Sequence, residues 1–352
     1  MRFPYDKFIS LFKPYIPSEV IGEVMGTLMS GWVGQGKKVY QFEHDFAEKF
    51  NQKYCVAMNS GTSALETAFG LVGIQPGDEV ITTPLTATCA NIALLRMGAK
   101  IVWADIDKET LCLNRQDVIN KTTSKTKAIV NVHLGGIESD IGEMFVPVIS
   151  DSCQALGIFS GDYTCNSFQA IKHITTGDGG MLTVNNEEEY KKAKLMRWFG
   201  IDRENIKVDY KIRTMTAEPE LLGYKRQMND IAAGMGISGL KHYAEVIAHR
   251  YKLFQLYKKL LKVPVIDGKR NTYWLCTVLL ENRDEVAEKL FKNGVETNLV
   301  HVRNDSMKIF GGRADLPTMD WVESRYLCLP LNMQTTEEDV IKISDLINSW
   351  TQ

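Results

Sequence analysis

The sequence lacks a long apolar run and a strong excess of either charge, and each absence excludes a class of protein. No uninterrupted apolar stretch approaches the ~18 residues that span a membrane, so we expect no membrane partner. The 41 basic and 43 acidic residues give a net charge of -2, which does not indicate a nucleic-acid partner. Charges and prolines interrupt the N-terminus where a signal peptide would have its apolar core, so we predict a cytoplasmic protein.

The chain also lacks closely spaced cysteines. Its seven cysteines are scattered and odd in number, and no two of them have CxxC spacing. This pattern predicts neither a disulfide framework nor a metal site, and buried thiols are the ordinary form of such cysteines in the cytosol. They are Cys55, Cys89, Cys112, Cys153, Cys165, Cys276 and Cys328.

What the sequence does contain is an alternation of short apolar runs with helix-like segments between residues 54 and 200. The segment 62–73 repeats apolar residues near a period of 3.6, which predicts an amphipathic helix. Strands that are apolar on both faces and alternate with helices predict a mostly parallel sheet covered on both sides. We expect these strands at 53–58, 78–83, 99–105, 126–133, 145–150 and 180–184.

The second half of the chain predicts a smaller C-terminal domain. A long amphipathic helix over 229–261 connects the two parts, and we place the large domain at 1–240 and the small one at 241–352. Strands are expected near 271–280 and 295–302. A last helix follows Thr336, which is a plausible N-cap residue.

Three stretches of the large domain carry residues suited to one cofactor. In "NSGTSAL" (59–65) a helix begins after a strand, and its free N–H groups with the hydroxyls of Thr62 and Ser63 predict an anion site. In "VPVISDSCQALG" a strand ends at Asp151, with Gln154 three residues later. In "SFQAIKHITTGDGG" a single lysine, Lys172, precedes a glycine-rich turn.

Each stretch also has an ordinary interpretation: a capping turn, an N-cap aspartate and a solvated turn lysine. Together, however, a phosphate site, an acid at a strand end and an amine fit pyridoxal phosphate. The aldehyde of this cofactor binds a lysine, its phosphate suits a helix start, and its ring nitrogen pairs with a carboxylate.

The order of these and other motifs resembles that of the nucleotide-sugar aminotransferases, which include perosamine and viosamine synthases. The resemblance covers nearly the whole chain and includes "SGWVGQGKKVYQFEHDFAEKF", "GAKIVWADID", "GYKRQMNDIAAGMG" and "LCLPL". It implies an α/β fold of the fold-type I aminotransferases. That fold has a large domain with a mostly parallel seven-stranded sheet flanked by helices, and a smaller α+β C-terminal domain.

The resemblance also implies roles for individual residues. Lys172 would be the Schiff-base lysine and proton shuttle, Asp151 would pair with the ring nitrogen, and Gln154 would lie against the ring or its 3-hydroxyl. Lys225 falls where a residue of the other subunit often reaches the phosphate, which implies a homodimer with a shared active site. The remaining phosphate ligands would be Gly61, Thr62, Ser63 and Ser167.

Substrate contacts are implied at two places. The N-terminal segment 1–35 would line the sugar-nucleotide cleft, and it contains Trp32, Gly34 and Gln35. The stretch "HVRNDSMKIF" departs from the usual C-terminal pattern, and it is either a substrate contact or a solvated loop. Its candidate substrate ligands are His301, Arg303 and Asn304.

Two further features depart from the pattern of the family. Many relatives stack an aromatic side chain on the cofactor where this chain has Ala87, and some members have a histidine in place of the lysine and catalyse deoxygenation. His173 is adjacent to Lys172, but the "GDGG" spacing favours Lys172 as the equivalent residue. We interpret His173 as a structural neighbour.

The implied reaction moves an amino group from L-glutamate, which becomes 2-oxoglutarate, to a nucleotide-linked keto sugar through pyridoxamine phosphate. The expected acceptor is a UDP- or dTDP-linked 4-keto-6-deoxyhexose. A GDP-linked acceptor, which would give perosamine, and a 3-keto sugar are alternatives. A dehydratase of the same fold and a non-catalytic homologue are rival interpretations.

Overall fold

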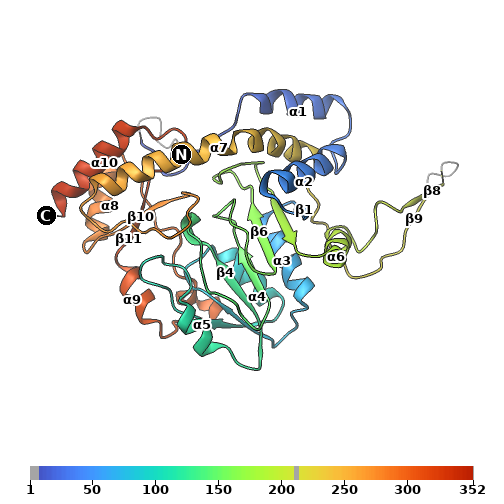
Figure 1. Ribbon diagram of the computed structural model, residues 1–352, viewed down its shortest axis with the longest axis horizontal. Helices are drawn as coiled ribbons and strands as arrows, with labels where there is room; N and C mark the ends of the chain where they lie inside the picture. The colour runs from blue at the N-terminus through green and yellow to red at the C-terminus, as the bar shows by residue number, and fades with distance from the viewer. Residues whose placement is uncertain (1–7, 210–213, 352) are drawn as a thin grey trace.

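A computed structural model describes residues 8–209 and 214–351 and contains a central seven-stranded sheet (Figure 1). The strand order is β1-β7-β6-β5-β4-β2-β3, and all pairs are parallel except those that β7 makes with β1 and β6. This confirms the predicted α/β class and the mostly parallel sheet. The strands are β1 Tyr54–Met58, β2 Glu79–Thr82, β3 Lys100–Trp103, β4 Thr126–Val132, β5 Val148–Asp151, β6 Tyr163–Ser167 and β7 Gly180–Val184.

Helices cover both faces of this sheet because its strands are apolar on both sides. In β1, Val56 and Met58 pack with α3 and α4, whereas Cys55 and Ala57 pack with α2 and α7. This alternation is the period of two expected for a strand between two layers. The helices of the large part of the chain are α1 Glu19–Met29, α2 Lys37–Phe50, α3 Gly61–Val72, α4 Thr88–Arg96, α5 Arg115–Lys121 and α6 Glu187–Arg197.

The C-terminal part has its own core around an antiparallel pair of strands, β10 and β11. The last helix begins as expected, because Thr336 and Asp339 form a reciprocal capping box. The long helix α7 runs through residue 240, and the boundary placed there stays a prediction. These elements are α7 Asp230–Leu260, β10 Cys276–Leu279, α8 Arg283–Lys292, α9 Pro317–Glu323, β11 Tyr326–Leu329 and α10 Glu337–Trp350.

Some expected strands differ from the structure. The predicted strand at 295–302 is wrong: the segment makes only single bridges, at Val295 to Ile9 and at Asn298 to Cys328. Strands β6 and β11 were not predicted. Neither was the pair β8 (Lys207–Asp209) and β9 (Thr214–Thr216), which Figure 1 shows at the end of an arm that projects from the body. Within 8–209 and 214–351, no helix is both long and apolar enough to cross a bilayer.

A buried histidine directly after β4 predicts how stability depends on pH. His133 is fully buried, and its Nδ1 accepts the N–H of Ser139 at 2.9 Å while Nε2 lies 3.1 Å from the hydroxyl of Ser160. Burial, with a smaller effect from Arg270, lowers its pKa to about 3. The neutral ring therefore stabilises the fold fully above the unfolded-state pKa of about 6.5, and this contribution decreases as the pH falls toward 3.

We expect the free energy of unfolding to fall by up to about 1.4 kcal/mol per pH unit below pH 6.5 from this group alone. Urea unfolding of the wild type and His133→Asn between pH 7 and 4.5 measures the difference, because the amide oxygen of asparagine replaces Nδ1 without titrating. His44→Asn, at an exposed site, is the control. Equal slopes for wild type and His133→Asn would contradict the prediction.

Candidate active site

Three segments that are distant in sequence meet at the carboxyl edge of the sheet. Asp151 ends β5, Lys172 lies in the connection between β6 and β7, and α3 begins at Gly61. The first residue of the antiparallel strand β7, Gly180, lies against the backbone just before α3. A Cβ at this position would be only 2.3 Å from the carbonyl oxygen of Ser60. The topology thus brings the predicted amine, acid and helix start together.

Lys172 and Asp151 modify each other's protonation. Burial lowers the pKa of Lys172, and the opposing charges of Cys153 and Asp151 limit that effect. Burial raises the pKa of Asp151, against the hydrogen bonds from Cys153 and the charge of Lys172. The Cys153 N–H donates to Asp151 Oδ1 at 3.1 Å. A lysine with a lowered pKa has more of its amine in the neutral, nucleophilic form.

The start of α3 is both a capped turn and a close approach between elements. The Ser60 side chain accepts the N–H of Ser63 at 3.0 Å, and the Ser63 hydroxyl donates to Asn59 Oδ1 at 2.7 Å. The hydroxyl of Ser63 thus takes part in the cap, and its predicted role toward the phosphate stays a prediction. A Cβ on Gly61 would lie 2.8 Å from Cys153 Sγ and 2.9 Å from Cβ of Ser167, so a larger residue would push these segments apart.

Gln154 connects this edge to the C-terminal part of the chain. Its Oε1 accepts the N–H of Gly135 at 2.9 Å, which directs its amide nitrogen toward Nε2 of His301 at 3.3 Å. Burial and then the charge of Lys172 lower the pKa of His301 to about 4. His301 is therefore neutral at pH 7 and accepts at Nε2. The structure brings His301, predicted as a substrate ligand, to Gln154.

Arg303 and Asn304 are placed differently. Arg303 is fully buried, and its guanidinium pairs with three carboxylates. Asn304, also fully buried, donates to the carbonyl of Thr86 at 2.9 Å and accepts from Asn91 at 3.0 Å. Their polar groups are already satisfied by the protein, so these contacts support a structural role rather than the expected substrate contact. The three carboxylates belong to Asp305, Asp320 and Glu323.

The predicted substrate residues Trp32, Gly34 and Gln35 lie before α2. Trp32 is 60% exposed, and its ring N–H donates to the Gln35 carbonyl at 3.2 Å. The Gly34 carbonyl accepts the N–H of Asp230 at 3.0 Å, where α7 begins. Trp32 and Gln35 line a pocket of about 600 Å³ between the starts of α2 and α7, whose lining does not include Lys172.

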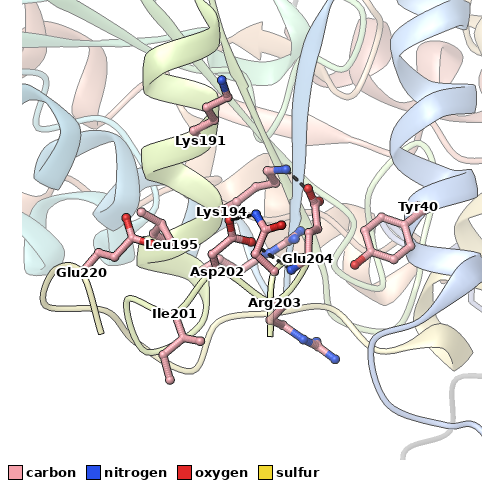
Figure 2. Close-up of a pocket in the computed structure, with 11 residues that line it drawn as sticks. Tyr40, Lys191, Lys194, Leu195, Ile201, Asp202, Arg203, Glu204 and Glu220 are labelled. Atoms are coloured by element: carbon pink, nitrogen blue, oxygen red, sulfur yellow. Dashed lines mark hydrogen bonds and ion pairs between the residues drawn. The ribbon is translucent and has the colours of Figure 1, made fainter. Parts of the chain in front are cut away.

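A second pocket of about 230 Å³ adjoins the first and shares Tyr40 and Arg203 with it (Figure 2). Figure 2 shows Lys194 of α6 joined to Glu204 by an ion pair, whose atoms are 2.7 Å apart. Arg203 donates to the side-chain oxygen of Gln35 at 2.7 Å. Lys194 and Glu204 thus neutralise each other in this pocket, and Arg203 connects it to Gln35 of the first pocket.

Lys225 lies on an exposed stretch between β9 and α7. Its backbone bridges to Trp198, while the neighbouring Arg226 pairs with Glu66. The side chain of Lys225 is therefore available to another molecule, and its predicted role toward a partner subunit stays a prediction.

Cys89 is a residue of the site that the sequence did not reveal. Ala87 is the N-cap residue of α4, and Cys89 follows in its first turn. We expected buried thiols, but Cys89 is exposed, and the expectation is wrong there. Desolvation and then the charge of Asp151 nevertheless raise the pKa of its thiol, and Lys172 opposes this. A side chain that solvent can reach, but that protein atoms surround closely, is expected at the bottom of an open binding site.

The chemistry of these groups fits pyridoxal phosphate. Lys172 supplies an amine, Asp151 a buried carboxylate, and the α3 start with Thr62 and Ser167 supplies N–H groups and hydroxyls suited to a phosphate. Thr62 and Ser167 are both partly exposed. Within the described ranges, no three His, Cys, Asp or Glu side chains are grouped as metal ligands.

Comparisons with known proteins agree with this fit. Residues 14–348 match the model of the DegT/DnrJ/EryC1/StrS aminotransferase family. The chain is 33% identical to the spore coat polysaccharide biosynthesis protein SpsC from Bacillus subtilis, over 97% of both chains. The structure of AtS13 from Actinomadura melliaura matches with a TM-score of 0.89 and 30% identity, over 97% of this chain and 98% of that one.

The sugar aminotransferase CalS13 from Micromonospora echinospora matches with a TM-score of 0.88 and 27% identity, over 97% of this chain and 99% of that one. The match to the family model and the fold confirm the predicted resemblance and the predicted cofactor. The chain belongs to the DegT/DnrJ/EryC1/StrS aminotransferase family, the pyridoxal-phosphate-dependent sugar aminotransferases of fold type I.

Proposed function

We propose that the protein transfers the amino group of L-glutamate to the C4 keto group of a UDP- or dTDP-linked 4-keto-6-deoxyhexose. The product is a viosamine-type 4-amino-4,6-dideoxyhexose for glycan synthesis. The observation that carries the amino-transfer step is the pair of Lys172 and Asp151 beside the start of α3. SpsC is described as acting in polysaccharide biosynthesis, and CalS13 as a sugar aminotransferase, which supports a sugar acceptor.

Each residue of the site has a different role in the proposed reaction. Pyridoxal phosphate, when bound, supplies the carbonyl carbon that carries nitrogen between donor and acceptor. Lys172 attaches the cofactor and, once released, moves a proton at its Nζ, for which the lowered pKa is suited. Asp151 would pair with the ring nitrogen of the cofactor. Thr62 and Ser167 with the α3 start would hold the phosphate, and Gln154 is fixed in orientation by Gly135.

A panel of nucleotide-linked keto sugars tests the proposal. UDP-, dTDP- and GDP-linked 4-keto and 3-keto sugars are each incubated with the holoenzyme and L-glutamate, and the products are analysed by mass spectrometry and NMR. Nitrogen at C4 of a UDP- or dTDP-linked product supports the proposal. Amination only of the GDP-linked sugar, amination at C3, or loss of oxygen without gain of nitrogen would overturn it.

An exposed apolar face of α1 supports the proposed homodimer. Met25 is 55% exposed, Leu28 54% and Met29 83%, and Trp32 continues this face beyond the helix. Contiguous apolar side chains at a surface mark sites of protein association. The opposite side of α1 packs on α7, so the exposed face is available to a second copy of this chain.

Charges on this face are expected to separate the dimer. Met25→Glu combined with Met29→Glu should raise the dimer dissociation constant by about 10-fold or more, because the interface would have to bury two carboxylates from each copy. Sedimentation velocity over a concentration series measures the change. Ile341→Glu introduces the same charge at another exposed apolar position, on α10, and should leave the dimer intact. An unchanged dimer in the double variant would contradict the prediction.

A further inference from the structure

Both neighbours of Lys172 in the sequence are hydrogen-bonded to one short segment of the C-terminal part. The indole N–H of Trp274 donates to the carbonyl of Ile171 at 3.0 Å. On the other side, Nε2 of His173 donates to the carbonyl of Thr272 at 2.7 Å. The segment 272–274 therefore holds the backbone of Lys172 from two directions.

Between these two bonds, the ring of Trp274 lies under the amine itself. Lys172 Nζ is 3.9 Å from the ring centroid of Trp274, within the range of a cation–π contact. The indole is 1% exposed and stacks on Phe12, with centroids 5.3 Å apart and planes inclined by 26°. A ring packed on its other face and hydrogen-bonded at its edge has one fixed orientation.

The backbone of this segment is also fixed to the turn that follows β4. Thr272 N–H donates to the Gly136 carbonyl at 2.8 Å, and Leu275 N–H donates to the Gly135 carbonyl at 3.0 Å. A Cβ on Gly136, which has a φ of +100°, would lie 2.8 Å from the backbone nitrogen of Trp274. Only glycine at position 136 allows the backbone of Trp274 to come this close. The neighbouring Gly135 also donates its N–H to Gln154 and so orients that side chain.

We propose that Trp274 is a positioning residue for Lys172, whose ring face receives the lysine Nζ whenever the amine is not attached to cofactor. A free lysine side chain has four rotatable bonds, and a fixed aromatic face selects the position in which the amine is held. The ring also favours the charged form of the amine. It therefore opposes the lowering of the Lys172 pKa by burial at the stage when Lys172 holds a proton. This role rests on the proposed function of Lys172, but the contact itself does not.

The test must separate the ring from the other groups around Lys172. These are Asp151 at the end of β5, Cys153 after it, Cys89 on α4, the adjacent His173, and His301 from the C-terminal part. None of them is changed by substitution of Trp274. Both Trp274→Phe and Trp274→Leu remove the indole N–H and its bond to Ile171, but only the leucine variant removes the aromatic face.

The experiment measures the pKa of Lys172 in the cofactor-free protein. Trace acetylation between pH 7 and 11, with quantitation of the Lys172 peptide by mass spectrometry, follows its neutral fraction. Trp274→Leu should lower this pKa by about 0.5 to 1 unit, and Trp274→Phe by less. An unchanged pKa in Trp274→Leu, or equal shifts in both variants, would overturn the proposal.

The chain provides a matched control elsewhere. Lys108 Nζ lies 3.9 Å from the ring centroid of Trp321, the same distance as at Lys172, but at an exposed site. Trp321→Leu removes an indole from this second lysine–tryptophan pair and should leave the pKa of Lys172 unchanged. A change at Lys172 in this variant would mean that distant substitutions alter the site, and it would overturn the proposal.

A second measurement avoids the risk that Trp274→Leu fails to fold. Fluorinated tryptophan, incorporated throughout the wild-type chain, weakens the negative ring face and leaves the shape nearly unchanged. The pKa of Lys172 should fall with each added fluorine. A pKa of Lys172 that does not change with fluorination would overturn the proposal. Neither measurement needs cofactor or substrate, so its outcome is distinct from that of the aminotransferase assignment.

Discussion

Replacement of Lys172 by alanine is expected to abolish amino transfer and covalent attachment of the cofactor. We expect a loss of turnover of about 10⁴-fold or more, since the proposed function assigns to this one side chain both the nucleophile and the proton carrier. Lys172 is the amine that lies over the ring of Trp274 and interacts with the charge of Asp151. Within the described residues, the nearest equivalent by geometry is Lys108 over Trp321, at the surface of the molecule.

The measurement combines three readouts. The absorbance of the holoenzyme before and after glutamate follows attachment of the cofactor, borohydride reduction with peptide mapping locates it, and product mass follows turnover. Lys172→Arg keeps the positive charge but should also lose attachment. Lys108→Ala is the matched control and should behave as wild type. Glutamate-dependent amination that persists in Lys172→Ala would refute the assignment of Lys172.

His173→Asn separates the lysine from its neighbour. His173 is buried with a pKa far below its usual range, mainly because of burial, and it holds the Thr272 carbonyl. A neutral imidazole that is hydrogen-bonded to a backbone carbonyl is a structural group, in agreement with our interpretation of His173 from the sequence. Its loss should therefore reduce stability more than it changes the position of cofactor attachment.

The sequence identified the residues whose chemistry is local. Asp151 and the α3 start were recognisable because they stand at a strand end and a helix start, and Lys172 because a glycine-rich turn follows it. Strand β6 was not recognisable, since it buries polar side chains. Asn166 is fully buried and donates to the carbonyl of Ser152 at 3.2 Å, and Thr164 donates to that of Ser160 at 3.0 Å. Such partners come from tertiary structure and leave no periodic signal.

The C-terminal contributions to the site were hidden for the same reason. The indole of Trp274 is in an apolar run that predicts only a strand, yet its face meets Lys172, about a hundred residues earlier. In the sequence, Arg303 and Asn304 resemble residues of a polar loop. Only the fold shows that Arg303 pairs with carboxylates and that Asn304 donates to the carbonyl of Thr86. Composition and spacing do not distinguish a polar side chain that is satisfied internally from one that faces a ligand.

Replacement of Asp151 by asparagine should reduce turnover by about 10²- to 10³-fold, the effect expected when a preorganised charge is removed from a site. The carboxylate is 3% exposed, and burial alone would favour its neutral form. The hydrogen bonds from Cys153 and the charge of Lys172 oppose this effect and favour the carboxylate form, which would pair with the cofactor nitrogen.

The same substitution should also change the pH dependence of cofactor attachment, and in a defined direction. The negative charge of Asp151 raises the pKa of Lys172 against burial, so its removal lowers that pKa further. The neutral amine is then present at lower pH, and the rate at which the cofactor-free protein binds pyridoxal phosphate should reach its plateau at a more acidic pH.

Asp151→Asn therefore separates two roles that one carboxylate has: turnover falls while attachment shifts toward acid. Stopped-flow absorbance of cofactor binding between pH 6 and 9.5, together with steady-state turnover, measures both. Asp151→Glu keeps the charge and should retain the wild-type direction of both profiles. A plateau that moves toward alkali in Asp151→Asn would show that Asp151 does not act on Lys172 through its charge, and unchanged turnover would exclude it as the partner of the cofactor ring.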